Sequence, residues 1–101
     1  MSTLISTADK EQHIRLRGEQ LAKRAGFRPK QLYTRNSMHG LTIIRGAMMY
    51  QMRWSCGYKL REIGAIFNRS PFTCCYWTKK LNDLEYIQDT EALHYINYIK
   101  P

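Results

Sequence analysis

Residues 60–81 read LREIGAIFNRSPFTCCYWTKKL, and this stretch decides the fold. Its first part, residues 60–67, repeats apolar residues at helical spacing, which predicts a short amphipathic helix. Ser70 is a favoured N-cap residue and Pro71 suits a first helical position, where its missing N–H removes no helical hydrogen bond. A second helix is therefore predicted to begin at Pro71. Two short helices joined by residues 68–70 match the helix-turn-helix pattern.

The second helix of this pair has an inward and an outward side. Helical spacing places Cys74, Leu81 and either Trp77 or Thr78 toward the core. The side chains left for the outward side are Phe72, Thr73, Tyr76, Lys79 and Lys80. Aromatic residues at helical spacing are usually core, so a buried Phe72 is the alternative for that position.

The flanking sequence predicts further helices and no strand. The expected elements are a helix that ends at Gly26, a short helical turn over 29–33, a polar loop over 34–40, a core helix over 41–55, and a last helix that is capped by Asp89 or Thr90 and buries Leu93, Ile96 and Ile99. The length of 101 residues suits one domain. We therefore expect an all-α, single-domain small helical bundle over residues 1–101.

Charge is unevenly distributed along the chain. Sixteen Lys and Arg face eight Asp and Glu, which gives a formal net charge of +8. No acidic residue occurs between Glu19 and Glu62, although nine Lys and Arg lie there. A solvated surface normally mixes both signs, so this pattern favours a polyanionic partner over an inert basic surface.

Other classes of protein lack their sequence signals. Cys56, Cys74 and Cys75 are an odd set with two neighbours, which favours reduced thiols in the cytoplasm over a disulfide framework. We expect no metal site, signal peptide or membrane-spanning segment, because the sequence patterns typical of each are lacking. Paired carboxylates, nucleophile triads and phosphate loops are also absent. We expect a non-catalytic binding domain without a cofactor.

The chain resembles the DNA-binding C-terminal domain of the bacterial replication initiator DnaA over roughly residues 14–82. The likeness is carried by Arg45 with the apolar helix that follows it, and by Glu62-Ile63-Gly64, Phe67-Asn68-Arg69 and Lys79-Lys80-Leu81. It implies an all-helical, Trp-repressor-like fold with a helix-turn-helix over 59–82 and a C-terminal helical extension over 83–101. It also implies a bacterial or bacteriophage context and a role in replication or transcription control.

The resemblance and the outward side of the second motif helix give two sets of candidate DNA contacts. The expected base-reading residues are Arg69, Ser70, Phe72, Thr73 and Tyr76. The expected phosphate or minor-groove contacts are Arg35, Arg45, Arg53, Lys59, Leu60, Arg61, Lys79 and Lys80. Double-stranded DNA is thus the expected partner.

One departure from the family keeps a second function open. The family's Asp-His-Thr-Thr signature is Ser70-Pro71-Phe72-Thr73 here, so only Thr73 and the preceding Arg69 match. An adaptor that keeps the scaffold without reading bases would use outward Phe72, Tyr76 and Tyr50 for a protein partner. RNA binding ranks below both, because no RNA-binding motif is present, and no dimerisation seam is evident.

Overall fold

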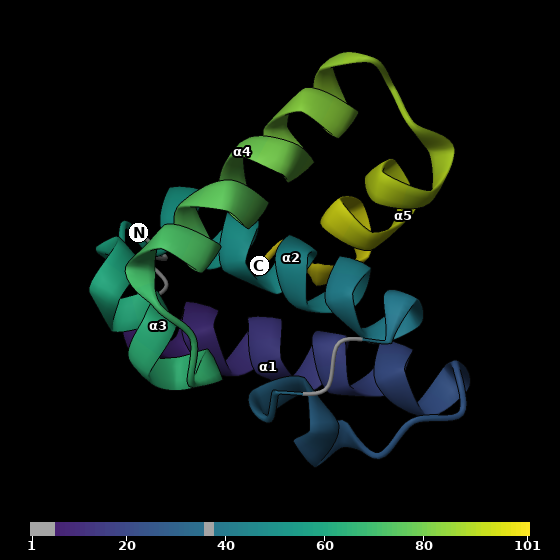
Figure 1. Ribbon diagram of the computed structural model, residues 1–101, viewed down its shortest axis with the longest axis horizontal. Helices are drawn as coiled ribbons and strands as arrows, with labels where there is room; N and C mark the ends of the chain where they lie inside the picture. The colour runs from purple at the N-terminus through teal and green to yellow at the C-terminus, as the bar shows by residue number, and fades with distance from the viewer. Residues whose placement is uncertain (1–5, 36–37) are drawn as a thin grey trace, which may run out of the picture.

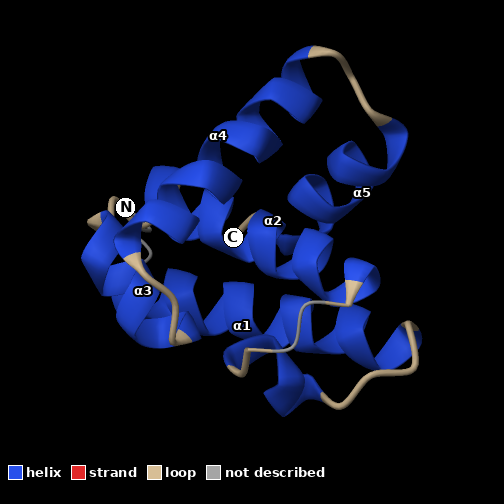
Figure 2. Ribbon diagram, viewed as in Figure 1, coloured by secondary structure: helices blue, strands red, loops and turns tan. Residues whose placement is uncertain are grey.

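The computed structural model describes residues 6–35 and 38–101, and every regular element in these ranges is helical (Figure 2). In chain order the elements are α1 (Thr7–Arg24), the 3₁₀ helix η1 (Pro29–Tyr33), α2 (His39–Trp54), α3 (Leu60–Phe67), α4 (Pro71–Tyr86) and α5 (Thr90–Ile99). The all-α prediction is confirmed. The start of the chain and the middle of the loop expected over 34–40 lie outside the described residues.

Capping residues set the starts of three helices. The side chains of Ser6, Ser70 and Asp89 each accept a hydrogen bond from the backbone N–H three residues further on, at 3.0–3.2 Å. Each bond satisfies one of the N–H groups that the first helical turn leaves unpaired. Ser70 caps α4 as predicted, and Asp89 takes the cap of α5 in preference to Thr90.

Helix α2 lies at the centre of the bundle, packed against α1, α4 and α5 (Figure 1). Every residue from Leu41 to Met52 is buried except the half-buried Thr42. Gly46 allows α4 to approach closely, because a Cβ at this position would lie 2.8 Å from atoms of both Trp77 and Leu81. Helix α2 therefore forms the centre of the hydrophobic core.

The C-terminal part of the chain belongs to the same bundle. Helix α4 continues past residue 82, where the helix-turn-helix was expected to end, and reaches Tyr86. The buried Gln51 donates from Nε2 to the Ile96 carbonyl at 3.0 Å, which ties α5 to α2. Along α5, Ile96 and Ile99 are buried as predicted, whereas Ala92 takes the buried position expected for Leu93.

Candidate nucleic-acid interface

The turn between α3 and α4 fixes how α4 leaves the bundle. Asn68 ends α3 in the left-handed conformation, with φ 56° and ψ 48°. The Arg69 N–H then donates to the Gly64 carbonyl at 2.9 Å. A Cβ on Gly64 would lie 2.4 Å from the Arg69 carbonyl oxygen, so this packing of the turn onto α3 requires glycine there. The position of the first turn of α4 therefore depends on Gly64 and Asn68.

A pocket of about 330 Å³ opens at the start of α4. It is lined by Arg35, Asn68, Arg69, Ser70 and Thr73. Arg35 comes from the segment between η1 and α2, so the fold joins it to residues more than thirty positions later. No acidic residue of the described ranges lines this pocket. Hereafter we call it the arginine pocket.

The electrostatics of the arginine pocket favour an anion. Burial lowers the pKa of Arg69 first, and the positive charge of Arg35 lowers it further. Two like charges repel each other, so an anion between them would relieve the repulsion. Guanidinium groups also bind phosphate and carboxylate oxygens through strong, charge-assisted hydrogen bonds. The pocket is therefore suited to a phosphate group.

Beyond the pocket, the outward side of α4 carries exposed aromatic rings and lysines. Phe72 is 87% exposed, which excludes the core position that was its alternative. Tyr76 is 58% exposed and meets the neighbouring Trp77 edge to face, with ring centroids 5.4 Å apart. Lys79 and Lys80 are exposed on the following turn. The side chains predicted to point outward from α4 do so, with Thr73 half-buried.

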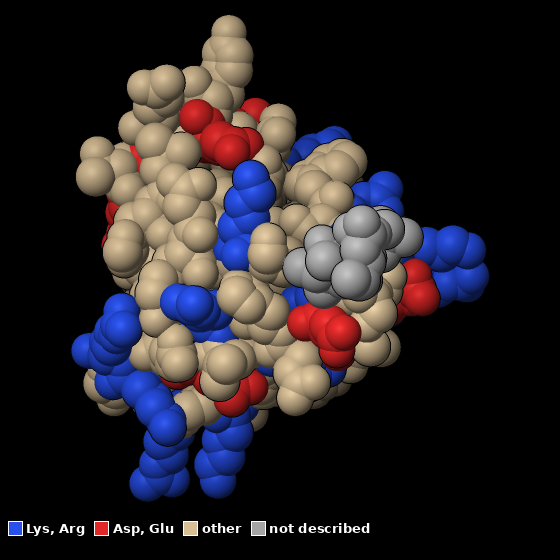
Figure 3. Space-filling view, turned by 180° about the vertical axis from the view of Figure 1, so that it is seen from behind, with Lys and Arg blue, Asp and Glu red and all other residues tan. Residues whose placement is uncertain are grey.

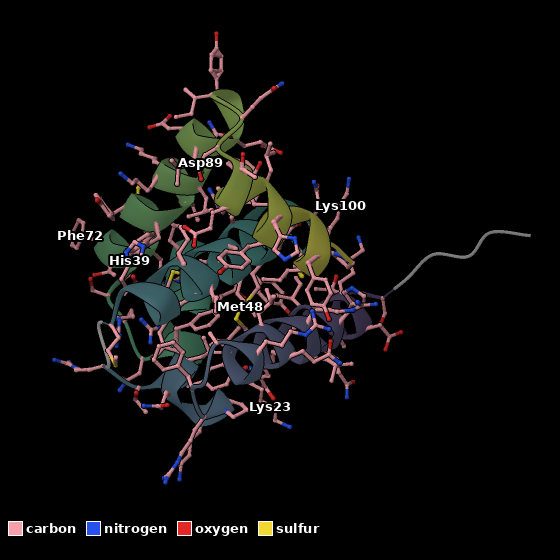
Figure 4. All side chains as sticks on the ribbon, turned by 90° about the vertical axis from the view of Figure 1, so that its right-hand side faces the viewer. Lys23, His39, Met48, Phe72, Asp89 and Lys100 are labelled. Atoms are coloured by element: carbon pink, nitrogen blue, oxygen red, sulfur yellow. The ribbon has the colours of Figure 1, made fainter. Side chains whose placement is uncertain are left out.

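The inward side of α4 also matches the sequence prediction. Cys74, Thr78 and Leu81 are buried, and the half-buried Trp77 packs at Gly46 of α2. In Figure 4, Phe72 and His39, the first residue of α2, project from the same side of the molecule.

The residues predicted to contact phosphates near α3 have mixed surroundings. Lys59 and Arg61 are exposed at the start of α3, with Leu60 half-buried between them. Arg53 is half-buried, donates from Nη1 to the Tyr58 carbonyl at 2.9 Å and stacks over Trp54 at 5.6 Å. Arg53 therefore stabilises the turn between α2 and α3, whereas Lys59 and Arg61 are accessible to a binding partner.

The prediction that Arg45 contacts DNA is wrong. Its side chain is 3% exposed, and it donates from Nε to the Leu32 carbonyl at 2.6 Å and from Nη2 to the Gln31 carbonyl at 3.0 Å. Burial, with a smaller contribution from the charge of Arg69, lowers its pKa to about 10. Arg45 instead fastens η1 to α2 and so supports the segment that leads to Arg35.

The expectation of an outward Tyr50 is also wrong. Tyr50 is buried and its hydroxyl donates to a carboxylate oxygen of Glu85 near the end of α4. Burial, followed by the hydrogen bond and the charge of Glu85, raises the pKa of Tyr50 to about 12. This residue links α2 to α4 and leaves the exposed aromatic surface to Phe72 and Tyr76.

Positive charge is not confined to the α3–α4 side. Lys and Arg side chains gather near the turn that joins α1 to η1, on the face seen from behind (Figure 3). The exposed basic residues of that region are Lys23, Arg24, Arg28 and Lys30. Net charge alone therefore does not select one face for a polyanion. The arginine pocket and the exposed rings distinguish the α4 side.

Two residues that shape the site were missed at the sequence level. Asn68 lines the arginine pocket and turns the chain, and Gly64 admits the turn. Asparagine is the residue after glycine that most readily adopts the left-handed conformation at a helix end, so Asn68 directly after Phe67 was an available signal. The close approach at Gly64 depends on the three-dimensional path of the turn and leaves no local signal.

Searches for other sites and for relatives gave negative results. Among the described residues no group of three His, Cys, Asp or Glu is placed to hold a metal ion. Within the same ranges, no helix has the length and apolar character needed to cross a bilayer. Comparison with protein-family models, curated proteins and solved structures gave no match.

Proposed function

We propose that this chain is a non-catalytic domain that binds double-stranded DNA through a helix-turn-helix formed by α3 and α4, with α4 in the major groove. The single observation that carries the proposal is the arginine pocket, in which Arg35 and Arg69 meet at the start of α4 and which no acidic residue of the described part of the chain lines. A duplex offers closely spaced phosphates next to a major groove wide enough for a helix. The arginine pocket would bind a phosphate, and the exposed side of α4 would lie in the major groove.

Affinity and specificity would come from different residues. Lys59, Arg61 and Lys80 are exposed around the α3–α4 pair and can neutralise phosphates, which gives binding that weakens with added salt. The arginine pocket would fix the register of the protein on the backbone. Phe72, Thr73 and Tyr76 would then meet base edges. The resemblance to the DnaA domain supports the same arrangement and suggests a role in replication or transcription control.

The test compares three labelled DNAs by fluorescence anisotropy. A duplex carrying a DnaA-type box, a scrambled duplex of equal length and a single strand are titrated at low and physiological salt. A duplex preference that persists at physiological salt supports the proposal. Equal binding to all three that disappears with added salt contradicts it, because that behaviour reflects charge alone.

A pair of arginine variants locates the contact. Arg69→Ala removes one side of the arginine pocket, and we expect about a tenfold loss of duplex affinity with a shallower salt dependence. Arg28→Ala removes an exposed charge near the turn between α1 and η1 and should change affinity much less. Thermal unfolding of both variants checks that the fold is intact. Equal losses for the two variants would contradict binding through the pocket.

An adaptor for a protein partner is the second candidate, favoured by a different observation. Besides Phe72 and Tyr76, the large apolar side chains of Trp54, Tyr86 and Ile87 are exposed on or beside α4. Exposed apolar groups of this size are typical of protein-binding surfaces. This function predicts only weak, salt-sensitive DNA binding. The anisotropy experiment therefore separates the two candidates.

A further inference from the structure

The large side chains that are exposed on the first two turns of α4 are aromatic. Phe72 and Tyr76 are four residues apart, which places their rings on one face of the helix. Both rings are largely exposed, and Phe72 carries no hydrogen-bonding group. Between them, the hydroxyl of Thr73 lies 3.2 Å from that of Ser70, so these two polar groups already contact each other. The most prominent feature of this face is therefore a pair of aromatic rings.

Charge around the rings points to DNA as the occupant. Arg35 and Arg69 line the pocket at the start of α4, and Lys79 and Lys80 are exposed one turn beyond Tyr76. The two rings therefore lie between two basic regions. This arrangement is complementary to a partner that has negative charge along both edges and an apolar group between them. The major groove of a duplex has this pattern, with phosphates along both sides.

The major groove offers one apolar feature for such rings. Base edges there present hydrogen-bond donors and acceptors, except for the C5 methyl group of thymine. A cytosine methylated at C5 carries the same group at the same position. Four residues along a helix correspond to about 6 Å, which is close to two base steps of about 3.4 Å. Phe72 and Tyr76 are therefore spaced to reach methyl groups on base pairs that lie two steps apart.

We infer that α4 recognises the C5 methyl groups of pyrimidines in duplex DNA, with Phe72 and Tyr76 each packing on one methyl. This inference rests on the proposed DNA-binding function and names what that site recognises. It explains how base recognition is compatible with the Ser70-Pro71-Phe72-Thr73 sequence, in which an aromatic ring stands where the family that the sequence resembles has a polar side chain. Specificity would come from apolar contact more than from hydrogen bonds.

The test removes methyl groups without changing base pairing. The protein first selects duplexes from a random pool at physiological salt. The selected duplexes are then copied with dUTP in place of dTTP, because deoxyuridine lacks only the C5 methyl of thymidine. We expect the affinity to fall about fourfold for each methyl contacted, and about tenfold or more for two. In duplexes where cytosine replaces thymine at a contacted position, copying with 5-methyl-dCTP in place of dCTP should increase the binding.

Variants of the rings assign the effect. Phe72→Ala should bring the thymine-to-uracil affinity ratio down about fourfold, and Phe72→Leu should keep most of the ratio because leucine also packs on a methyl. Tyr86→Ala is the matched control, since Tyr86 is an exposed aromatic at the other end of α4 and should leave the ratio unchanged.

The possible outcomes separate this inference from the proposed function. Equal affinity for the thymine and uracil duplexes, with the duplex preference kept, overturns methyl recognition and leaves DNA binding standing. A ratio that Phe72→Ala does not change also overturns it. If no duplex is retained at physiological salt, the proposed function fails and the inference fails with it.

Discussion

Helices α2 and α4 are both sixteen residues long, but they differ in how much of their sequence the fold uses. Eleven residues of α2 are buried, including Arg45 and Gln51, against three residues of α4. Packing therefore constrains most side chains of α2, whereas half of the residues of α4 are exposed. We therefore expect the exposed aromatic rings of α4 to act in binding, and the buried polar groups of α2 to stabilise the fold.

The largest effect on stability is expected for Arg45 in α2. Arg45→Ala removes the donors to the Leu32 and Gln31 carbonyls and leaves a cavity beside them. We expect a loss of about 3 kcal/mol in the free energy of unfolding, measured by urea denaturation. Arg61→Ala, which truncates an exposed arginine at the start of α3, should change it by no more than about 0.5 kcal/mol. Similar values for both variants would show that Arg45 is not a structural residue.

Arg45 also shows where prediction from the sequence stops. The apolar side of α2 could be predicted because it follows helical spacing, and the start of α4 could be predicted because Ser70 and Pro71 act locally. The burial of Arg45 could not, since its acceptors lie in η1, thirteen and fourteen residues away. The residues around an arginine in the sequence do not indicate whether its side chain is buried on backbone carbonyls or exposed and able to bind a phosphate.

The candidate site was predictable to a similar degree. The outward residues of α4 follow from its start and its period, so Phe72 and Tyr76 could be placed on a surface. The meeting of Arg35 with Asn68, Arg69, Ser70 and Thr73 depends on where the fold places Arg35, just after η1, relative to the α3–α4 turn. That contact is non-local, and for Arg35 it was expected only through the resemblance.

The next largest effect concerns the support of α4. Gly64→Ala places a Cβ against the Arg69 carbonyl, which is backbone and cannot rotate away. We expect a loss of about 2 kcal/mol in the free energy of unfolding, together with weaker duplex binding in the anisotropy assay because the turn and α4 must shift. Ala65→Ser is the control: Ala65 is exposed on the same helix, so the added hydroxyl meets solvent and should change the free energy of unfolding by no more than about 0.5 kcal/mol. A Gly64→Ala protein that keeps both stability and affinity would show that α4 does not depend on this turn.

A smaller, pH-dependent effect is expected where α2 and α4 are linked. The pKa of Tyr50 is raised to about 12 in the folded protein from an ordinary value of 10, so the folded state holds this proton more tightly than the unfolded state. Its contribution to stability is therefore complete below pH 10 and is lost as the pH rises toward 12. Tyr50→Phe should cost about 1 kcal/mol at pH 8, and this difference should shrink by pH 12.

Urea denaturation at several pH values measures the effect of Tyr50→Phe. Tyr86→Phe is the matched control, because the Tyr86 side chain is 82% exposed and should change neither the stability nor its pH dependence. A Tyr50→Phe protein with the same alkaline loss as the wild type would mean that the bond to Glu85 does not link the two helices.

The smallest effect on stability is expected at Phe72, and it is the most informative about α4. Because 87% of this side chain is exposed, Phe72→Ala removes almost no buried surface, and the free energy of unfolding should stay within about 0.5 kcal/mol of the wild type. Leu81→Ala on the same helix removes a fully buried side chain and should cost about 3 kcal/mol. If Phe72→Ala destabilised the protein as much as Leu81→Ala, the ring would be a packing residue and the contrast between α2 and α4 would lose its basis. If Phe72→Ala left stability unchanged but lowered duplex affinity, the residue would act only in binding, because its loss would cost nothing in the free protein.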